Sequence, residues 1–389
     1  MTTAPLPDLT QLIRPGDGIV AGQACAEPQT LMEALVAQRA AFSGARLFLG
    51  VNYAGIVRPE HADHLRLSAY CGAGHNRALA DAGVLDIHPH PYSRYAALIR
   101  ERRIPCDVAL VQVSAPNARG EFSMGLSADY LLPAIRCART VIAEVNQRVP
   151  WTHSEHLFRR EDFAALVESS REPATPPPAR AGDLEAAIAR HAADWIPDGA
   201  TLEFGLGTLP DAVCAALGGK KGLKVHTGTV GDGVVDLLKS GAVESVDCAM
   251  LIGTRKLFEC ANANAAIRLR SSEYTHDPRV LATLPCFVAI NSAVEVDLTG
   301  QVNAEVAKGS YLGAVGGALD FMRAAMFSPG GVSLLLLPAA RIARTLAGPV
   351  STPRSEAGVI ITERGAADLR GCTLQERARR MLAISRLEP

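Results

Sequence analysis

The feature that most constrains the fold is a series of short apolar runs that alternate with helical patterns. The runs are bounded by turn residues and lie at residues 108–113, 140–143, 249–252, 333–337 and 359–361. Residues 184–195 and 374–382 carry apolar side chains at helical spacing. Because parallel strands need a crossover connection, usually a helix, this alternation predicts an α/β fold of largely parallel sheets covered by helices.

One stretch departs from this pattern. Within residues 288–302, apolar and polar side chains alternate from Val294 to Leu298, and Thr299-Gly300 follow as a turn. Alternation with period two is typical of a strand with one buried face, and a short glycine turn is typical of a hairpin. We therefore expect a local antiparallel hairpin here.

A proline-rich segment divides the chain. Pro176, Pro177 and Pro178 are consecutive, and such a run neither continues a helix nor lies in a central strand. We expect an extended linker at residues 172–182, an N-terminal domain at 1–171 and a C-terminal domain at 183–389. With 389 residues, the chain is long enough for each domain to bury its own core.

The two halves open in the same way. Residues 15–22 and 197–205 each form a turn, a short apolar run and a glycine-containing loop. A helical pattern with proline near its start follows, at Pro28 in the first half and Pro210 in the second. This shared order predicts two similar, duplicated α/β domains.

Composition narrows the classes of partner. The formal net charge is -1, so nothing indicates a nucleic acid or an anionic membrane as partner. The nine cysteines are scattered without a Cys-x-x-Cys pair, and we expect neither a metal site nor a disulfide framework. The first residues do not resemble a signal peptide, and no run of about 18 apolar residues is present. We therefore expect a cytoplasmic protein.

The most informative motif is at residues 225–237, which read Val-His-Thr-Gly-Thr-Val-Gly-Asp-Gly-Val-Val-Asp-Leu. This motif resembles the active-site segment of the acetyl-CoA hydrolase/transferase family, the class I CoA-transferases related to 4-hydroxybutyrate CoA-transferase. Residues 108–116, 205–210, 290–302 and 362–371 also resemble segments of that family, in the same order. The resemblance implies two similar α/β domains with an active site in the cleft between them.

The resemblance also implies the ligands. A coenzyme A thioester would be substrate or ligand, a carboxylic acid would be the second small-molecule partner, and no tightly bound cofactor or metal is implied. A homodimer is plausible by the same resemblance alone.

One residue departs from the family pattern. In that family the active-site segment carries a glutamate nucleophile, which takes the acyl group and then CoA, whereas the residue at that position here is Gly228. Glycine has no side chain and cannot act as nucleophile, acid or base. Our first candidate for a replacement carboxylate is Glu203. Asp232 and Glu305 match acidic positions that ordinary members also carry, so we favour structural roles for both.

Two histidines are weaker candidates for acid–base catalysis. His226 matches a family residue beside the nucleophile, and its alternative role is to position the end of the strand. His75 lies in the glycine loop at residues 72–77, and its alternative role is to cap or pack that loop.

Two glycine loops are predicted to contact the acyl-CoA. Gly205 and Gly207 belong to a Gly-x-Gly-x-x-Pro loop after a predicted strand, where the backbone can approach a ligand closely. We reject dinucleotide binding because Pro210 stands where a third glycine would be needed. The resemblance implies that the N–H groups of Gly316 and Gly317 hold a thioester carbonyl or CoA. The alternative for both loops is a plain strand-to-helix turn.

The sequence thus predicts a protein that moves an acyl group or CoA between a thioester and a carboxylate or water, without the usual glutamate. We expect an enzyme, either a CoA-transferase or an acyl-CoA hydrolase. The alternative is a catalytically altered or inactive member that binds an acyl-CoA or a related ligand, because a fold can persist after its chemistry is lost.

Overall fold

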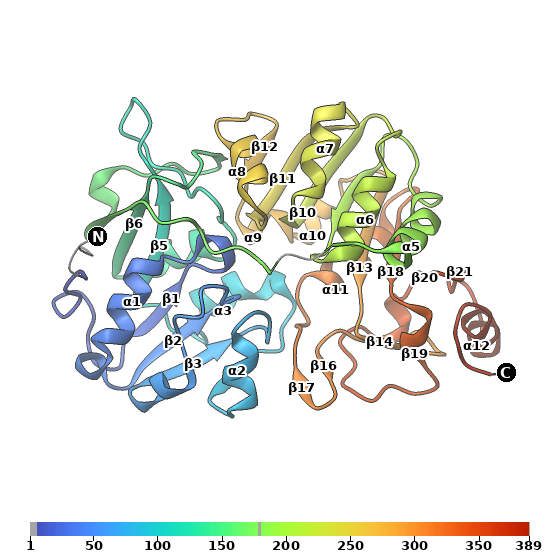
Figure 1. Cartoon of the computed structure of the whole chain (residues 1–389), viewed down its shortest axis with the longest axis horizontal. Helices are drawn as coiled ribbons and strands as arrows, with labels where there is room; N and C mark the ends of the chain where they lie inside the picture. The colour runs from blue at the N-terminus through green and yellow to red at the C-terminus, as the bar shows by residue number, and fades with distance from the viewer. Residues whose placement is uncertain (1–5, 178–179, 389) are drawn as a thin grey trace. The chain divides into compact units, whose positions relative to one another are not determined.

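The computed structural model describes residues 6–177 and 180–388. The chain forms two compact units (Figure 1). Unit 1 comprises the described residues up to His90, together with Arg94–Pro176 and Ala249–Glu273. Unit 2 comprises Pro91–Ser93, the described residues from 177 to 248, and those from Tyr274 onward. Residues 249–273 thus belong to unit 1 although they follow the proline-rich segment, of which residues 178 and 179 lie outside the described residues.

Unit 1 contains a seven-stranded sheet with the strand order β4-β3-β2-β1-β5-β6-β8. All of its neighbouring strands are parallel. Its strands are β1 (Gly18–Ala21), β2 (Ala45–Leu49), β3 (Leu65–Ala69), β4 (Leu85–Ile87), β5 (Val108–Ser114), β6 (Thr140–Asn146) and β8 (Ala165–Ser169). Every residue of β5 and β6 is buried, as expected for strands covered on both faces.

The helices of unit 1 are α1 (Gln29–Ala37), α2 (Asn76–Asp81), α3 (Tyr95–Arg100), α4 (Leu131–Cys137) and α8 (Arg255–Ala261), and α9 (Ser272–Thr275) begins in this unit. A short parallel pair, β7 (His153–Ser154) and β12 (Ile267–Leu269), joins the segment at 249–273 to the rest of unit 1. Leu31, Leu35, Leu47 and Leu110 lie in the apolar core, which α1 shares with the sheet.

Unit 2 contains strands in the order β21-β20-β18-β13-β9-β10-β11. They are β9 (Thr201–Phe204), β10 (Leu223–Val230), β11 (Val243–Leu251, which ends in unit 1), β13 (Phe287–Ser292), β18 (Val332–Leu336), β20 (Val359–Thr362) and β21 (Gly365–Asp368). The pairing of β9, β10, β13, β18 and β20 is parallel, and β21 pairs antiparallel with β20. Small sheets are formed by β14 (Glu295–Asp297), β15 (Val302–Asn303) and β19 (Ile342–Ala343), and by β16 (Val306–Ala307) and β17 (Ser310–Tyr311).

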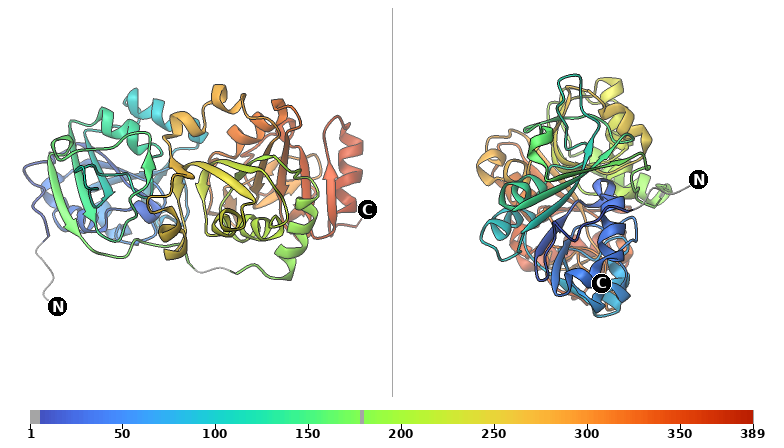
Figure 2. Two further views of the ribbon diagram at one scale, coloured as in Figure 1. Left: turned by 90° about the horizontal axis from the view of Figure 1, so that it is seen from above. Right: turned by 90° about the vertical axis from the view of Figure 1, so that its left-hand side faces the viewer.

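The helices of unit 2 are α5 (Asp183–Ala193), α6 (Thr208–Ala216), α7 (Gly233–Ser240), α10 (Pro278–Leu281), α11 (Ala318–Phe327) and α12 (Leu374–Ala383). Helix α11 packs on β13 and β18, and its Phe321 and Ala325 share a core cluster with Phe287 and Ala289 of β13. Helix α12 packs beside β21 near the C-terminal end (Figure 2). No helix in the described ranges is both long and apolar enough to cross a membrane.

The two units repeat one strand order. In unit 1 the order is β3-β2-β1-β5-β6-β8, so the first strand, β1, lies between β2 and β5. In unit 2 the order is β11-β10-β9-β13-β18-β20, so the first strand, β9, lies between β10 and β13. This confirms the predicted α/β class with largely parallel sheets, and it supports duplicated domains. The predicted hairpin is confirmed in β14 and β15, which pair antiparallel. However, residues 287–292 form the central parallel strand β13, because the run from Phe287 to Ile290 is buried on both faces.

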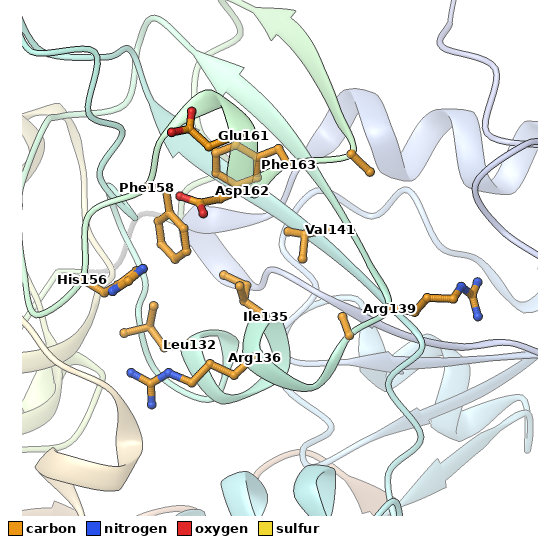
Figure 3. Close-up of a pocket in the computed structure, with 12 residues that line it drawn as sticks. Leu132, Ile135, Arg136, Arg139, Val141, His156, Phe158, Glu161, Asp162 and Phe163 are labelled. Atoms are coloured by element: carbon orange, nitrogen blue, oxygen red, sulfur yellow. The ribbon is translucent and has the colours of Figure 1, made fainter.

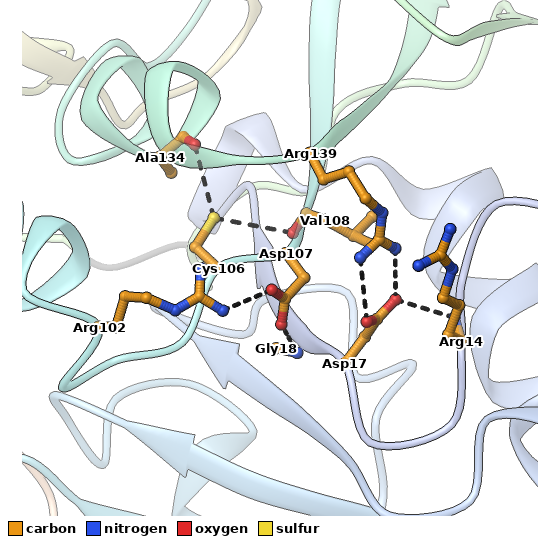
Figure 4. Close-up of polar contacts among 9 residues, drawn as sticks. All are labelled: Arg14, Asp17, Gly18, Arg102, Cys106, Asp107, Val108, Ala134 and Arg139. Carbon is orange, nitrogen blue, oxygen red and sulfur yellow. Dashed lines mark hydrogen bonds and ion pairs between the residues drawn. The ribbon is translucent and has the colours of Figure 1, made fainter.

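A polar cluster ties the starts of β1 and β5 together at the amino end of the unit 1 sheet (Figure 4). Asp107 accepts a hydrogen bond from the backbone N–H of Gly18 at 2.8 Å and forms an ion pair with Arg102 at 2.5 Å. Asp17 pairs with Arg139 at 2.8 Å. The cluster therefore fixes the two central strands at the end of the sheet opposite to their carboxyl ends.

Candidate functional site

The topology of unit 2 points to the carboxyl ends of β9 and β13. From β9 the chain proceeds to β10 and β11 on one side, whereas β13 and β18 lie on the other side. Ligands of open parallel α/β sheets bind where the strand order reverses in this way, outside the carboxyl ends of the strands. Gly205 follows β9 at this edge, and Asn291 lies at the end of β13 with its Oδ1 3.6 Å from a Cβ built on Gly205.

Gly228 lies near the carboxyl end of the neighbouring strand β10, and an imidazole ring lies against it. A Cβ built on Gly228 would lie 3.2 Å from both Cε1 and Nε2 of His276. The same ring lies against the loop before α11, because a Cβ on Gly317 would lie 2.7 Å from Nε2. Two glycines that the sequence assigned to the site are therefore brought together around one histidine, which the sequence analysis did not select.

The ring of His276 is held from several directions. It packs between Tyr92 and Phe321, with ring centroids 5.0 Å and 4.6 Å away. Its Nδ1 shares a hydrogen bond of 2.8 Å with Oγ1 of Thr275. Burial, with a smaller effect of nearby His226, lowers the pKa of His276 to about 3. The imidazole is therefore neutral near neutral pH and is fixed in one orientation.

The loop before α11 presents backbone N–H groups. Gly317 is the N-cap residue of α11, and Gly316 has a φ of 60°, a left-handed conformation that favours glycine. Their carbonyl groups accept hydrogen bonds from Phe321 and Tyr92, but no acceptor for either N–H is found among the described residues. Free N–H groups at a helix N-terminus stabilise negative charge on a ligand oxygen.

Glu203 is buried inside the edge of the sheet. Its side chain is 2% exposed, and Oε2 accepts a hydrogen bond of 2.8 Å from Nδ2 of Asn291. Burial raises the pKa of Glu203 to about 8, although Asn291 and the backbone of Ile290 lower it. The carboxyl group is therefore protonated near neutral pH. It can donate a proton, and a role as replacement nucleophile stays a prediction.

His226 faces the segment that carries His276. Its Nε2 lies 2.9 Å from the carbonyl oxygen of Thr275, and its ring lies 5.7 Å from that of Tyr274. His226 and Gly228 are two residues apart on β10 and share a face of the sheet. The contact with Thr275 suits the positioning role, because it fixes the residue that precedes His276. A catalytic role for His226 also stays a prediction.

The remaining candidates are more dispersed. Glu305 accepts hydrogen bonds from Ser351 and Tyr311, at 2.7 and 2.6 Å, which suits the structural role expected for it. Asp232 is the N-cap residue of α7. Gly207, with a φ of 123°, is the N-cap residue of α6. His75 is exposed in unit 1, and its ring lies beside Gly55.

A separate cavity of about 460 Å³ lies in unit 1 (Figure 3). It is lined by apolar side chains such as Ile135 and Phe163 and by the charged groups of Arg136 and Glu161. None of the site residues predicted from the sequence lines it. In the described ranges, no group of three or more histidine, cysteine or acidic side chains is arranged to hold a metal ion.

Comparison with known proteins identifies the family. The acetyl-CoA hydrolase/transferase N-terminal domain matches residues 5–158, and the C-terminal domain of the same family matches residues 253–386. The 4-hydroxybutyrate coenzyme A transferase of Clostridium kluyveri is 35% identical over 390 residues, which cover 94% of this chain and 90% of the relative. The chain belongs to the acetyl-CoA hydrolase/transferase family. The resemblance inferred from the sequence is thereby confirmed.

Solved structures of the family agree with this assignment. RipA from Yersinia pestis has a TM-score of 0.92 at 30% identity, covering 97% of this chain and 92% of RipA. A 4-hydroxybutyrate CoA-transferase from Porphyromonas gingivalis has a TM-score of 0.79 at 30% identity, with the same coverage. The acetyl-CoA hydrolase of Saccharomyces cerevisiae is 29% identical over 250 residues, or 57% of this chain and 46% of the relative. The family thus includes both CoA-transferases and acetyl-CoA hydrolases.

Proposed function

We propose that this family member acts on an acyl-CoA thioester and passes the acyl group to water or to a carboxylic acid without a protein carboxylate at position 228. The observation that carries this proposal is the arrangement at the carboxyl edge of unit 2. Gly228, the neutral imidazole of His276 and the free N–H groups of Gly316 and Gly317 lie in one place. Such groups can polarise a thioester carbonyl without forming a covalent bond to it.

The names of the relatives support the class of substrate. The matched proteins include transferases named for 4-hydroxybutyrate, for butyryl-CoA with acetate, and for succinyl-CoA with cyclohexane-1-carboxylate, as well as acetyl-CoA hydrolases. All of these names contain coenzyme A or one of its thioesters, and those of the transferases also contain a carboxylic acid. We propose the same two ligand classes for this chain, with the thioester bound at the edge formed by Gly205, Gly228 and Gly317.

The attacking oxygen would then come from the second substrate. Water gives a free acid and CoA thiol. A carboxylate gives a mixed anhydride and CoA thiolate, and the thiolate can attack the other carbonyl of the anhydride to form the exchanged thioester. In both routes the C–S bond of the thioester breaks and CoA leaves as the thiolate. A protonated Glu203 is a candidate to supply the proton that the thiolate needs.

The test uses purified full-length protein with acetyl-, butyryl-, succinyl- and 4-hydroxybutyryl-CoA, each with and without acetate. Free thiol in the absence of acetate would indicate hydrolysis, and formation of acetyl-CoA only with acetate would indicate transfer. Saturable binding of the thioesters with neither product would overturn the proposal. That result would favour the alternative of a protein that binds an acyl-CoA without turning it over. The absence of a carboxylate at Gly228 is the specific argument for this alternative.

A Gly228→Glu/His276→Gly variant is a matched positive control. In the single Gly228→Glu variant the Cβ would lie 3.2 Å from the His276 ring, so the ring would have to shift slightly, and His276→Gly removes this crowding. If the position is that of the family nucleophile, the paired variant gains a covalent acyl or CoA adduct at residue 228, detectable by mass spectrometry, and the wild type does not. An adduct on wild-type Glu203 would show that this carboxylate has taken over the role.

A further inference from the structure

His276 has a ring nitrogen that no described residue satisfies. Its Nδ1 is paired with Thr275, but Nε2 has no hydrogen-bond partner in the described part of the chain. The side chain is only 2% exposed. Nε2 is not one of the fully buried side-chain atoms without a partner in the described part of the chain, so it keeps some accessible surface. A ligand atom can therefore reach this nitrogen and form the hydrogen bond that it lacks.

The unpaired nitrogen points at the place where a ligand is expected. The Nε2–Cε1 edge of the ring faces Gly228, and the Nε2–Cδ2 edge faces Gly317. Nε2 therefore lies between Gly228, near the end of β10, and Gly317, the N-cap residue of α11. The N–H groups of Gly317 and of the preceding Gly316 have no acceptor among the described residues. N–H groups that reach the same ligand oxygen stabilise an oxyanion.

We propose that His276 is a catalytic residue, whose Nε2–H donates a hydrogen bond to the carbonyl oxygen of the bound thioester beside the N–H groups of Gly316 and Gly317. This inference rests on the proposed function. In the tautomer that it assigns, Oγ1 of Thr275 donates to Nδ1, so that Nε2 carries the hydrogen. His276 neither gains nor loses a proton during the reaction, and it stabilises the negative charge that develops on the carbonyl oxygen.

The surroundings of His276 suit a donor more than a base. Because burial lowers its pKa, the ring remains neutral over the working pH range and is a poor proton acceptor. A neutral imidazole can nevertheless polarise a carbonyl group, and it does so best when it is fixed in place. Tyr92, Phe321 and Thr275 provide that fixation here.

The first test compares His276→Phe, which keeps a planar ring but has no donor, with His276→Gln, which keeps an N–H donor. With the acyl-CoA that the wild type uses best, we expect His276→Phe to lower kcat by about 10²–10³-fold. KM should change much less, because the bond strengthens in the transition state. His276→Gln should retain part of the lost rate. The matched control is His191→Phe on α5, a partly exposed histidine outside the site.

A purely structural role would give a different pattern. Both His276 variants should melt within about 4 °C of the wild type, because each loses only the single hydrogen bond to Thr275 and keeps a side chain of similar size. A folded His276→Phe protein with wild-type kcat would overturn the proposal while leaving the proposed function intact. A loss of kcat that follows a loss of folded protein in both variants would overturn it as well.

A spectroscopic measurement tests the hydrogen bond between His276 and the ligand carbonyl independently of turnover. The probe is S-acetonyl-CoA, a ketone analogue of acetyl-CoA that cannot release its thiol, added to protein with ¹⁵N-labelled histidine. We expect the Nε2 resonance of His276 to shift on binding and the ketone stretching frequency to be lower in the wild type than in His276→Phe. If the probe binds and neither signal differs, the contact does not exist. If no acyl-CoA is turned over, the proposed function fails, and the catalytic role of His276 fails with it.

Discussion

At the scale of single residues, Gly228 and His276 form a steric pair. The imidazole lies against the backbone of Gly228, so that even a methyl group at position 228 would approach the ring to 3.2 Å. The ring has little freedom to retreat because Tyr92 and Phe321 pack against it. A side chain at 228 and an imidazole at 276 therefore compete for the same volume.

This competition predicts non-additive mutations. We expect Gly228→Ala to lower the free energy of unfolding by about 1 kcal/mol through overpacking. In Gly228→Ala/His276→Ala the crowding is absent, so the paired variant should be more stable than the sum of the two single changes, by about 0.5–3 kcal/mol. Urea unfolding of the four proteins measures this coupling. Additive effects would show that the two residues are not in contact.

Glu203 predicts a dependence of stability on pH. Its folded-state pKa of about 8 lies above the ordinary value of 4.5, so the folded state keeps a proton that the unfolded state loses. The stabilisation is complete below about pH 4.5 and is lost as the pH rises through about 8. Since one pKa unit corresponds to about 1.4 kcal/mol, the wild type should lose a few kcal/mol across this window relative to Glu203→Gln. Parallel urea titrations at pH 5 and pH 9 would contradict this if the difference between the two proteins stayed constant.

At the scale of elements, the carboxyl ends of the strands in unit 2 and the amino ends of the strands in unit 1 carry different kinds of residue. The carboxyl ends of β9, β10 and β13 in unit 2 present glycines, Asn291 and the free N–H groups before α11. The amino ends of β1 and β5 in unit 1 are instead held by the carboxylates of Asp17 and Asp107 (Figure 4). The polar cluster thus holds the amino end of the unit 1 sheet, whereas the candidate site lies at the carboxyl end of the unit 2 sheet.

The contacts of Asp107 predict a variant that lowers the free energy of unfolding and leaves turnover unchanged. Asp107→Ala leaves the N–H of Gly18 and the Arg102 guanidinium without their acceptor, and we expect a loss of about 1–3 kcal/mol in the free energy of unfolding. Glu259→Ala, which breaks the exposed pair with Arg255, is the control and should change stability by less than about 0.5 kcal/mol. Turnover per folded molecule should be unchanged in both. Equal stability losses in the two variants would refute the role of Asp107.

At the scale of the whole molecule, the chain is a family member with duplicated α/β architecture. Both units place a first strand between its successor and a later strand, and this is the point where ligands of open parallel α/β sheets bind. The apolar cores on the sheet faces, which include Leu47 and Leu110 in unit 1 and Phe287 and Phe321 in unit 2, fix the strands that form these edges.

The proposed ligand class predicts a thermal shift of the full chain. A ligand that binds only the folded state raises the melting temperature in proportion to its concentration relative to Kd. We expect acyl-CoA thioesters and free CoA to raise the Tm of the protein in a saturable way, and NAD to have no effect at equal concentration. A larger shift with NAD would contradict both the rejection of dinucleotide binding and the proposed ligand.

The sequence by itself determined the α/β class, the main strands, the family and the glycine at position 228. These depend on local information: short apolar runs specify buried parallel strands, and motifs such as residues 225–237 are contiguous. Only the tertiary structure revealed the position of His276 against Gly228 and Gly317. It follows α9, 48 residues beyond Gly228, and nothing around it in the sequence resembles a catalytic motif. Its position between Gly228 and Gly317 depends on how β10, α9 and α11 pack, which local patterns do not specify. The same packing pairs Glu203 with Asn291 and raises its pKa, because burial is a property of the folded chain as a whole.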